Sequence, residues 1–184
     1  PGMKDFKKFG PFAYTAKLRN GLFRNTGACL SPQNAFYNSI GMETFGLRME
    51  RVCDNAKTLA QFFATEYSDI EVNYPGLAGS KWHNIATEQF GDKFGGIITI
   101  RTGNKKRAFG IIDALKLPLI VSNIGDTKTL VIHPESTLNV HSTQEEKETA
   151  GVFDDLIRIS VGIEDIDDLI DDFKQAIESV KDVY

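Results

Sequence analysis

The stretch DLIRISVGIEDIDDLIDDF, residues 155–173, decides the fold of this sequence. From Leu156 to Val161 the side chains alternate between two faces, and one of these faces is wholly apolar, which is typical of a strand. Gly162 ends the strand. The apolar residues that follow recur every three or four positions, as they do along one side of an amphipathic helix. The stretch therefore predicts a strand, a glycine turn and a closing helix.

Arg158 lies in the middle of this apolar strand, and its charge needs an explanation. On the pattern alone, the favoured interpretation is a solvated arginine on the open face of an antiparallel sheet. The other interpretation is a residue that binds a substrate carboxylate, because a planar guanidinium donates two parallel hydrogen bonds to a carboxylate where an ammonium cannot. The strand itself leaves both interpretations open.

Composition and net charge limit the classes of function that this chain could have. The 184 residues suffice for one sizeable core, and 41% hydrophobic with 25% charged residues is typical of a globular protein. The net charge is -4 without a basic stripe, which argues against nucleic acid as a partner. Apolar runs are too short to span a membrane, and the first residues contain no signal-peptide core. Cys29 and Cys53 form neither a disulfide framework nor a metal site, so a cytoplasmic location is expected.

Hydrophobic periodicity predicts the elements upstream of the quoted stretch. A long helical pattern begins at Ser31, a favourable N-cap followed by Pro32, and runs to Glu66 with a bend or break expected at Gly41 and Gly46. The remaining segments predict a loop over residues 1–10, a short helix at 12–24, strands at 70–74, 97–101, 117–122 and 129–132, and helices at 81–89, 104–115 and 142–150. The expected fold class is α+β with mixed α/β layers. It has a small, mostly antiparallel sheet of four to five strands, with helices on one face and a long connecting helix before it.

The other chemically versatile residues do not form a recognisable centre. His83, His133 and His141 are too scattered in the sequence for a metal-ligand set and are expected at surface or capping positions. The aspartates of the closing helix have helical spacing and indicate a solvated acidic face. Glycine-rich phosphate loops and nucleophile-elbow motifs do not occur in the sequence. We therefore expect no metal site and no self-sufficient catalytic site in this chain.

Six phrases of the sequence occur together, and in this order, in one family of enzymes. They are TGACLSPQNAF (26–36), LRMER (47–51), VNYPGL (72–77), NIGDTKTL (123–130), HPEST (133–137) and LIRISVGIED (156–165). Through them the chain resembles, over essentially its whole length, the C-terminal part of the cysteine/methionine-metabolism enzymes, which are fold-type I enzymes dependent on pyridoxal 5'-phosphate (PLP). The resemblance is greatest to the O-acetylhomoserine sulfhydrylase branch, whose typical motif Asn-x-Gly-Asp-x-Lys-x-Leu matches residues 123–130.

The resemblance implies roles for three residues. Arg158 matches the arginine that binds the substrate α-carboxylate, Asn123 matches the residue that supports this carboxylate, and Ser122 contributes from its backbone. The implied reaction eliminates the acetyl ester of O-acetylhomoserine and adds sulfide or a thiol, giving homocysteine or methionine, with PLP carrying the chemistry. One phrase departs from the family: Ser136-Thr-Leu-Asn139 stands for Ser-Thr-Thr-His, so no role is assigned to a histidine in that loop.

The resemblance also implies that the chain is part of a longer enzyme. The family's Schiff-base lysine and phosphate-binding residues belong to a part that would precede Pro1, so the chain alone is expected to bind no PLP and to be inactive. Residues 1–66 are expected to be the linker and connecting helices from that PLP-binding domain, and residues 67–184 the C-terminal domain that binds the substrate carboxylate. The intact enzyme is expected to be a homotetramer, and the chain alone to self-associate through the segment from Phe12 to Phe36.

Two alternatives stay open. Methionine γ-lyases and cystathionine enzymes belong to the same family, and they tend to have serine where Asn123 stands here. The cystathionine enzymes also tend to have glutamate in place of Lys128. The alternative from another class is a non-catalytic α+β interaction module descended from such enzymes.

Overall fold

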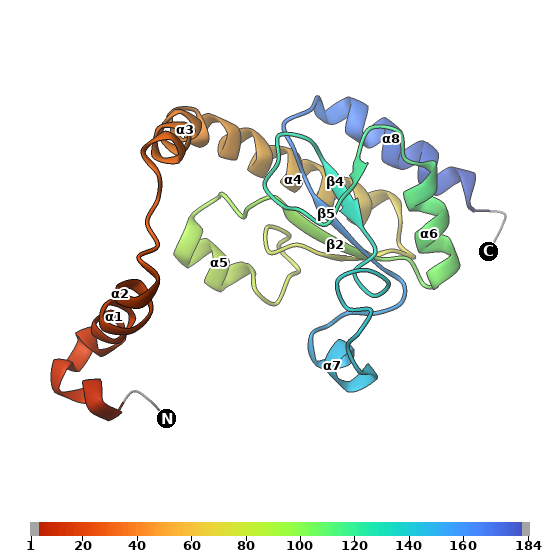
Figure 1. Ribbon diagram of the computed structural model, residues 1–184. Coiled ribbons are helices and arrows are strands. Elements are labelled where there is room, and N and C mark those ends of the chain that lie inside the picture. The colour runs from red at the N-terminus through yellow and green to blue at the C-terminus, as the bar shows by residue number, and fades with distance from the viewer. Residues whose placement is uncertain (1–3, 182–184) are drawn as a thin grey trace. The chain divides into compact units, whose positions relative to one another are not determined.

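The computed structural model describes residues 4–181, with side chains from residue 7 onward, and the chain forms two compact units that divide between Thr44 and Phe45. The first unit consists of helical segments joined by loops (Figure 1). Its elements are η1 (Lys4–Phe12), α1 (Ala13–Leu18), η2 (Arg19–Phe23), α2 (Arg24–Thr26) and α3 (Pro32–Glu43). The loop predicted over residues 1–10 is wrong from residue 4 onward, because short 3-10 turns need only local hydrogen bonds and no apolar periodicity. Residues 1–3 lie outside the described range.

Helix α3 begins where the sequence predicts. Ser31 has an extended backbone and its Oγ accepts a hydrogen bond from the Asn34 N–H at 3.2 Å. Pro32 occupies the first helical position, where a backbone N–H would have no partner in the helix. The predicted break in the long helical pattern falls at Thr44, after which helix α4 (Phe45–Glu66) begins the second unit.

The second unit is built on one five-stranded sheet (Figure 1). Its strands are β1 (Glu71–Asn73), β2 (Ile97–Arg101), β3 (Leu119–Ile120), β4 (Leu130–Ile132) and β5 (Leu156–Ser160), in the spatial order β1-β2-β5-β4-β3. Neighbouring strands are antiparallel except for the parallel pair β3 and β4. The fold class predicted from the sequence, a small and mostly antiparallel sheet in mixed α/β layers, is therefore confirmed.

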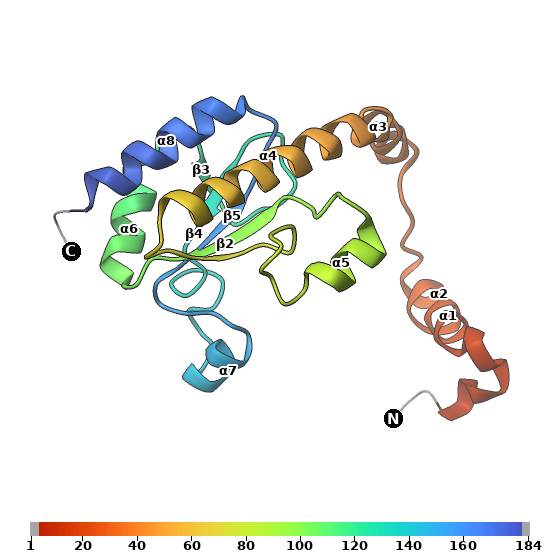
Figure 2. The same ribbon diagram turned by 180° about the vertical axis from the view of Figure 1, so that it is seen from behind.

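Helices α4, α6 (Lys105–Ala114) and α8 (Ile166–Ser179) contribute to the same core as the sheet, and Figure 2 shows α4 and α8 in front of the strands. Helices α5 (His83–Phe90) and α7 (Gln144–Thr149) lie in connections between strands. Because α4 supplies Leu59 and Phe63 to this core, the second compact unit includes α4. The division expected between residues 66 and 67 concerns the intact enzyme and stays a prediction.

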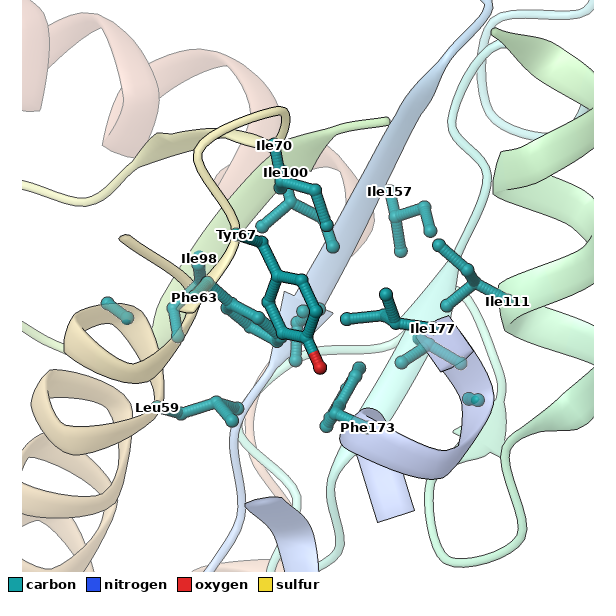
Figure 3. Close-up of a cluster of buried hydrophobic side chains, with 14 of the residues drawn as sticks. Leu59, Phe63, Tyr67, Ile70, Ile98, Ile100, Ile111, Ile157, Phe173 and Ile177 are labelled. Carbon is teal, nitrogen blue, oxygen red and sulfur yellow. The ribbon is translucent and has the colours of Figure 1, made fainter. Parts of the chain in front are cut away.

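The core of the second unit joins aliphatic strand residues to aromatic helix residues (Figure 3). Ile157 and Ile159 of β5 are fully buried. Phe63 of α4 and Phe173 of α8 meet edge to face, with ring centroids 5.2 Å apart, which adds to the free energy gained by burying both rings. Because successive residues of a strand point to opposite faces, burial of the two isoleucines directs Arg158 away from the core.

One carboxylate in the connection between β4 and β5 binds lysines from helix α6 and from α7, the helix within that connection. Glu135 Oε2 accepts a hydrogen bond from Lys105 Nζ of α6 at 2.8 Å, and its Oε1 accepts one from Lys147 Nζ of α7 at 2.5 Å. These bonds to Lys105 and Lys147 lower the pKa of Glu135 to about 2. The ionised form of this side chain is therefore the one that the fold stabilises.

Replacing Phe63 by alanine should destabilise the second unit strongly. The fully buried ring leaves a cavity beside Phe173, and such truncations cost about 3 to 5 kcal/mol in free energy of unfolding. Phe90→Ala is the matched control, because the Phe90 ring is 62% exposed and its loss should cost less than about 0.5 kcal/mol. Urea unfolding followed by circular dichroism measures both. Equal stabilities of the two variants would contradict the core described above.

Glu135→Gln should remove a pH-dependent part of the stability. The pKa of Glu135 in the folded chain, about 2, lies below its ordinary value of 4.5. The ionised carboxylate therefore stabilises the fold above about pH 4.5, and this stabilisation is lost as the pH falls toward 2. We expect the wild type to be about 1 kcal/mol more stable than the variant near neutral pH, and the difference to shrink on acidification. Urea unfolding of both proteins over this range measures it; a difference independent of pH would be the contrary result.

Candidate functional site

Arg158 occupies the middle of the open face of the sheet. It lies at the centre of β5, opposite Thr99 of β2 on one side and Ile132 of β4 on the other. Its neighbours along the strand, Ile157 and Ile159, point into the core, so the Arg158 side chain points to the opposite face. The hydrophobic pattern of β5 thus places one guanidinium at the centre of the sheet.

The structure brings together the three residues that the resemblance singles out. Nη2 of Arg158 donates a hydrogen bond to the Ser122 carbonyl at 2.8 Å and lies 3.4 Å from the Asn123 carbonyl. Ser122 and Asn123 follow strand β3, so the guanidinium reaches past β4 to the loop beyond it. Both contacts use backbone oxygens. The Asn123 side chain, which the resemblance assigns to supporting the substrate carboxylate, makes neither of them.

The arrangement leaves donors of the guanidinium available. A guanidinium has five N–H groups, and the two carbonyls engage only Nη2. Within residues 4–181, the Arg158 Nε has no hydrogen-bond partner although it is shielded from solvent. Oxygen atoms of a carboxylate are the acceptors that match such a set of donors. Chemically, the site can therefore bind and orient an anion.

A hollow of about 780 Å³ lies beside β1 and β2, on the face of the sheet that carries Arg158. Its lining includes Thr99, which faces Arg158 across the strands, together with Trp82 and Arg101. Arg101 differs from Arg158 because its Nε donates to the buried Asp155 carboxylate at 2.9 Å. Arg158 is not among the residues that line the hollow, and its guanidinium is bound by neutral carbonyls and not by a carboxylate.

Sequence reasoning missed the residues that hold the loop after β3. The Gly125 N–H donates to Ser160 Oγ at 3.1 Å, and the Thr129 N–H donates to Glu164 Oε1 at 2.5 Å. In both pairs the partners are 35 residues apart in sequence. The only local signal was that Ser160 and Glu164 belong to the same phrase as Arg158. That signal does not identify their partners.

Two of the three histidines, His83 and His133, take structural positions. One ring nitrogen of the buried His133 lies 2.9 Å from Ser136 Oγ and the other 2.8 Å from the Asp154 carbonyl. His83 Nδ1 lies 2.9 Å from the Pro75 carbonyl. In the described part of the chain, no three His, Cys, Asp or Glu side chains come together in a group that could hold a metal ion.

The described residues do not fit PLP as a complete site. A lysine that bonds covalently to this cofactor needs burial or nearby cations to become a nucleophile, and from residue 7 to residue 181 no lysine side chain is buried. Lys93, Lys105 and Lys147 are ion-paired with carboxylates. Lys81 lines the hollow, but it is exposed and its Nζ lies 5.0 Å from the Trp82 ring centroid. None of the described lysines therefore has surroundings suited to a covalent bond with the cofactor.

Comparisons with known proteins identify a family. A family model for Cys/Met metabolism PLP-dependent enzymes matches residues 9–178. The O-acetyl-L-homoserine sulfhydrylase of Corynebacterium glutamicum is 38% identical over 97% of this chain and 41% of its own length. The L-methionine gamma-lyase of Fusobacterium nucleatum subsp. polymorphum is 41% identical over 87% of this chain and 40% of its own length. The chain thus spans about two fifths of the length of these relatives.

Solved structures agree with the family match. A putative O-acetylhomoserine (thiol)-lyase of Campylobacter jejuni subsp. jejuni, which contains N'-pyridoxyl-lysine-5'-monophosphate, superposes with a TM-score of 0.83. It is 38% identical and the match covers 91% of this chain and 40% of that one. An O-acetylhomoserine sulfhydrylase of Wolinella succinogenes superposes with a TM-score of 0.75 at 36% identity, over 96% of this chain and 48% of that one. As its six phrases predicted, the chain belongs to the Cys/Met metabolism family of PLP-dependent enzymes.

Proposed function

We propose that this chain is the part of a PLP-dependent O-acetylhomoserine sulfhydrylase that binds the α-carboxylate of the amino-acid substrate. The observation that carries the proposal is the Arg158 guanidinium, which is held by the carbonyls of Ser122 and Asn123 and keeps its other donors free for an anion. Support for the branch comes from the names of similar proteins, among them a homocysteine synthase of Schizosaccharomyces pombe that is 39% identical over 96% of this chain.

The role proposed for this chain is binding and orientation. In such enzymes the cofactor carries the bond-breaking chemistry, while a fixed carboxylate holds the substrate in one orientation and so raises the effective concentration of the reactive arrangement. Arg158 supplies the charge and the direction for that carboxylate. The overall reaction proposed is elimination of the acetyl ester followed by addition of sulfide or a thiol, giving homocysteine or methionine.

A methionine γ-lyase is the second candidate, because a protein of that name is 41% identical to this chain. Both activities begin with an amino acid whose α-carboxylate needs a partner, so Arg158 serves either one. The phrase from Asn123 to Leu130 favours the sulfhydrylase over a γ-lyase, since γ-lyases tend to have serine where Asn123 stands.

Assembly and location are further parts of the proposal. We expect a homotetramer for the intact enzyme, and self-association of the chain alone through the segment from Phe12 to Phe36. The exposure of both terminal rings of this segment, 70% for Phe12 and 62% for Phe36, is consistent with such contacts. Among the described helices, none is both long and apolar enough to cross a membrane. A cytoplasmic compartment is proposed on the basis of the family's metabolic role and the two free cysteines.

The test is to express the gene with all the coding sequence around this chain and to assay the product. We expect PLP uptake and thiol-dependent consumption of O-acetylhomoserine, and no turnover by the 184-residue chain alone. Methionine and cystathionine, supplied in parallel, separate the sulfhydrylase from the other branches. A protein that takes up no PLP in any form would instead support the non-catalytic interaction module.

Arg158→Lys should raise the KM for the amino-acid substrate about 10- to 100-fold, because an ammonium cannot reproduce the donors of the guanidinium. Arg101→Lys is the matched control, since Arg101 lies on the same face but is ion-paired with Asp155 and Glu71. Its effect on KM should stay below about threefold. Steady-state kinetics of both variants measure the difference. A larger effect on KM at Arg101 than at Arg158 would show that Arg101, and not Arg158, binds the substrate carboxylate.

A further inference from the structure

The loop from Ser122 to Lys128 is exposed along its whole length, yet two of its carbonyl oxygens hold the Arg158 guanidinium. An untethered loop samples many backbone conformations, and fixing each residue has an entropic cost of about 1 to 2 kcal/mol. The sheet fixes the start of the loop, where the Val121 N–H donates to the Val131 carbonyl at 3.2 Å, so the remaining freedom lies in its middle and its end.

Glu164 fixes the end of the loop. Its Oε1 accepts a hydrogen bond from the Thr129 N–H at 2.5 Å, and its Oε2 accepts one from the Thr129 hydroxyl at 2.9 Å. The same hydroxyl accepts a hydrogen bond from the Gly162 N–H at 2.9 Å, and the Ile163 N–H donates to the Thr127 carbonyl at 2.9 Å. These bonds join the turn after β5 to the residues that end the loop.

The turn approaches the loop so closely that only glycine fits at residue 162. A Cβ on Gly162 would lie 2.4 Å from the Thr127 carbonyl oxygen and 2.5 Å from Glu164 Oε2. Real side-chain carbons do not come this close to oxygen atoms. Gly162 is therefore required by the contact between turn and loop, in addition to ending the strand.

Helix α4 holds the turn that carries Glu164. Asn55 is 2% exposed, and its Nδ2 donates to the carbonyls of Gly162 at 3.1 Å and Glu164 at 2.9 Å. Nη2 of Arg51 donates to the same Glu164 carbonyl at 3.2 Å. A buried NH2 group that donates to two carbonyls leaves the turn little freedom. The Glu164 carboxylate thus extends from a fixed backbone.

A second tether starts from the strand that carries the guanidinium. Ser160 Oγ accepts a hydrogen bond from the Gly125 N–H, in the middle of the loop, at 3.1 Å. Ser160 is two residues after Arg158, so both side chains lie on the same face of β5. The middle and the end of the loop are therefore both tied to β5 and to the turn that follows it.

We propose that Glu164 is a positioning residue for carboxylate binding. By holding Thr129 through both of its carboxylate oxygens, it fixes the loop at the place where Ser122 and Asn123 orient Nη2 of Arg158. The remaining guanidinium donors then face the ligand. This inference rests on the proposed function, in which Arg158 binds the substrate α-carboxylate, and Glu164 acts through the loop without contacting that carboxylate.

Two variants break this tether and two leave it intact. Glu164→Gln keeps the size of the side chain but offers one oxygen in place of two, and Thr129→Val removes the hydroxyl. Thr129→Ser keeps the hydroxyl. Asp69→Asn is the matched control, because the Asp69 carboxylate accepts from Arg107 Nη1 at 2.6 Å and precedes β1, at the opposite edge of the sheet from β3.

The first measurement needs no turnover and uses the 184-residue chain. In protein labelled with ¹⁵N, relaxation should give order parameters near 0.85 for the loop amides of the wild type, falling below about 0.6 in Glu164→Gln and Thr129→Val. The Arg158 Nε–H, assigned with Arg158→Lys, should become more mobile in the same two variants. Thr129→Ser and Asp69→Asn should match the wild type. Unchanged mobility in both tether variants overturns the proposal, whatever reaction the enzyme catalyses.

The second measurement uses the PLP-loaded enzyme. Glu164→Gln should raise the KM of the amino-acid substrate about tenfold while kcat changes less than about twofold, because the loss is one of carboxylate binding. An inhibitor with a carboxamide in place of the carboxylate should bind equally well to the wild type and the variant. If the variant weakens both ligands to the same extent, Glu164 has a general structural role and the proposal is wrong. If the enzyme proves to act on a different amino acid, the same comparison is made with that substrate.

Discussion

The alternation of β5 between the face that packs on the helices and the opposite face, which carries Arg158, is the constraint on which the rest of the second unit depends. Ile157 and Ile159 are fully buried against the helices. A slip of one residue in the register of this strand would turn Arg158 into the core, where an unpaired charge has a very high free-energy cost. The hydrophobic core therefore fixes which face of the sheet carries the guanidinium. Fold and site are consequences of the same five-residue strand.

The parts of the fold that could be predicted from the sequence are those with a local signal, namely helix caps and hydrophobic periodicity. The N-cap predicted at Ser31 accepts a backbone N–H, and Asn104 and Thr143 do the same at the starts of α6 and α7, within two residues of the predicted helix starts at 104 and 142. Strand β3 is shorter than its predicted range of 117–122, because only Leu119–Ile120 pairs with a neighbour. Its parallel pairing with β4 cannot be predicted from hydrophobic periodicity, which is a local property of each segment.

The contacts around Arg158 were beyond sequence reasoning for a physical reason. Its guanidinium is held by two backbone carbonyls, and every residue of any sequence has such a group. The path of the loop decides which carbonyls the guanidinium can reach. That path is fixed by hydrogen bonds between residues far apart in sequence, such as Thr129 and Glu164. The resemblance to a family named Arg158, Asn123 and Ser122 together, whereas the residues that hold their loop in place became visible only in three dimensions.

The kind of partner that holds each arginine decides which of the two on the open face is suited to an anion. Arg101 and Arg158 both alternate with buried isoleucines, so the pattern does not separate them. Arg101 is paired with the buried carboxylate of Asp155, and its charge is compensated within the chain. The carbonyls around Arg158 are neutral dipoles: they fix the direction of the guanidinium but leave its full positive charge for a ligand. A carboxylate in their place would have oriented the same side chain and cancelled the charge on which the proposed binding of a substrate carboxylate depends.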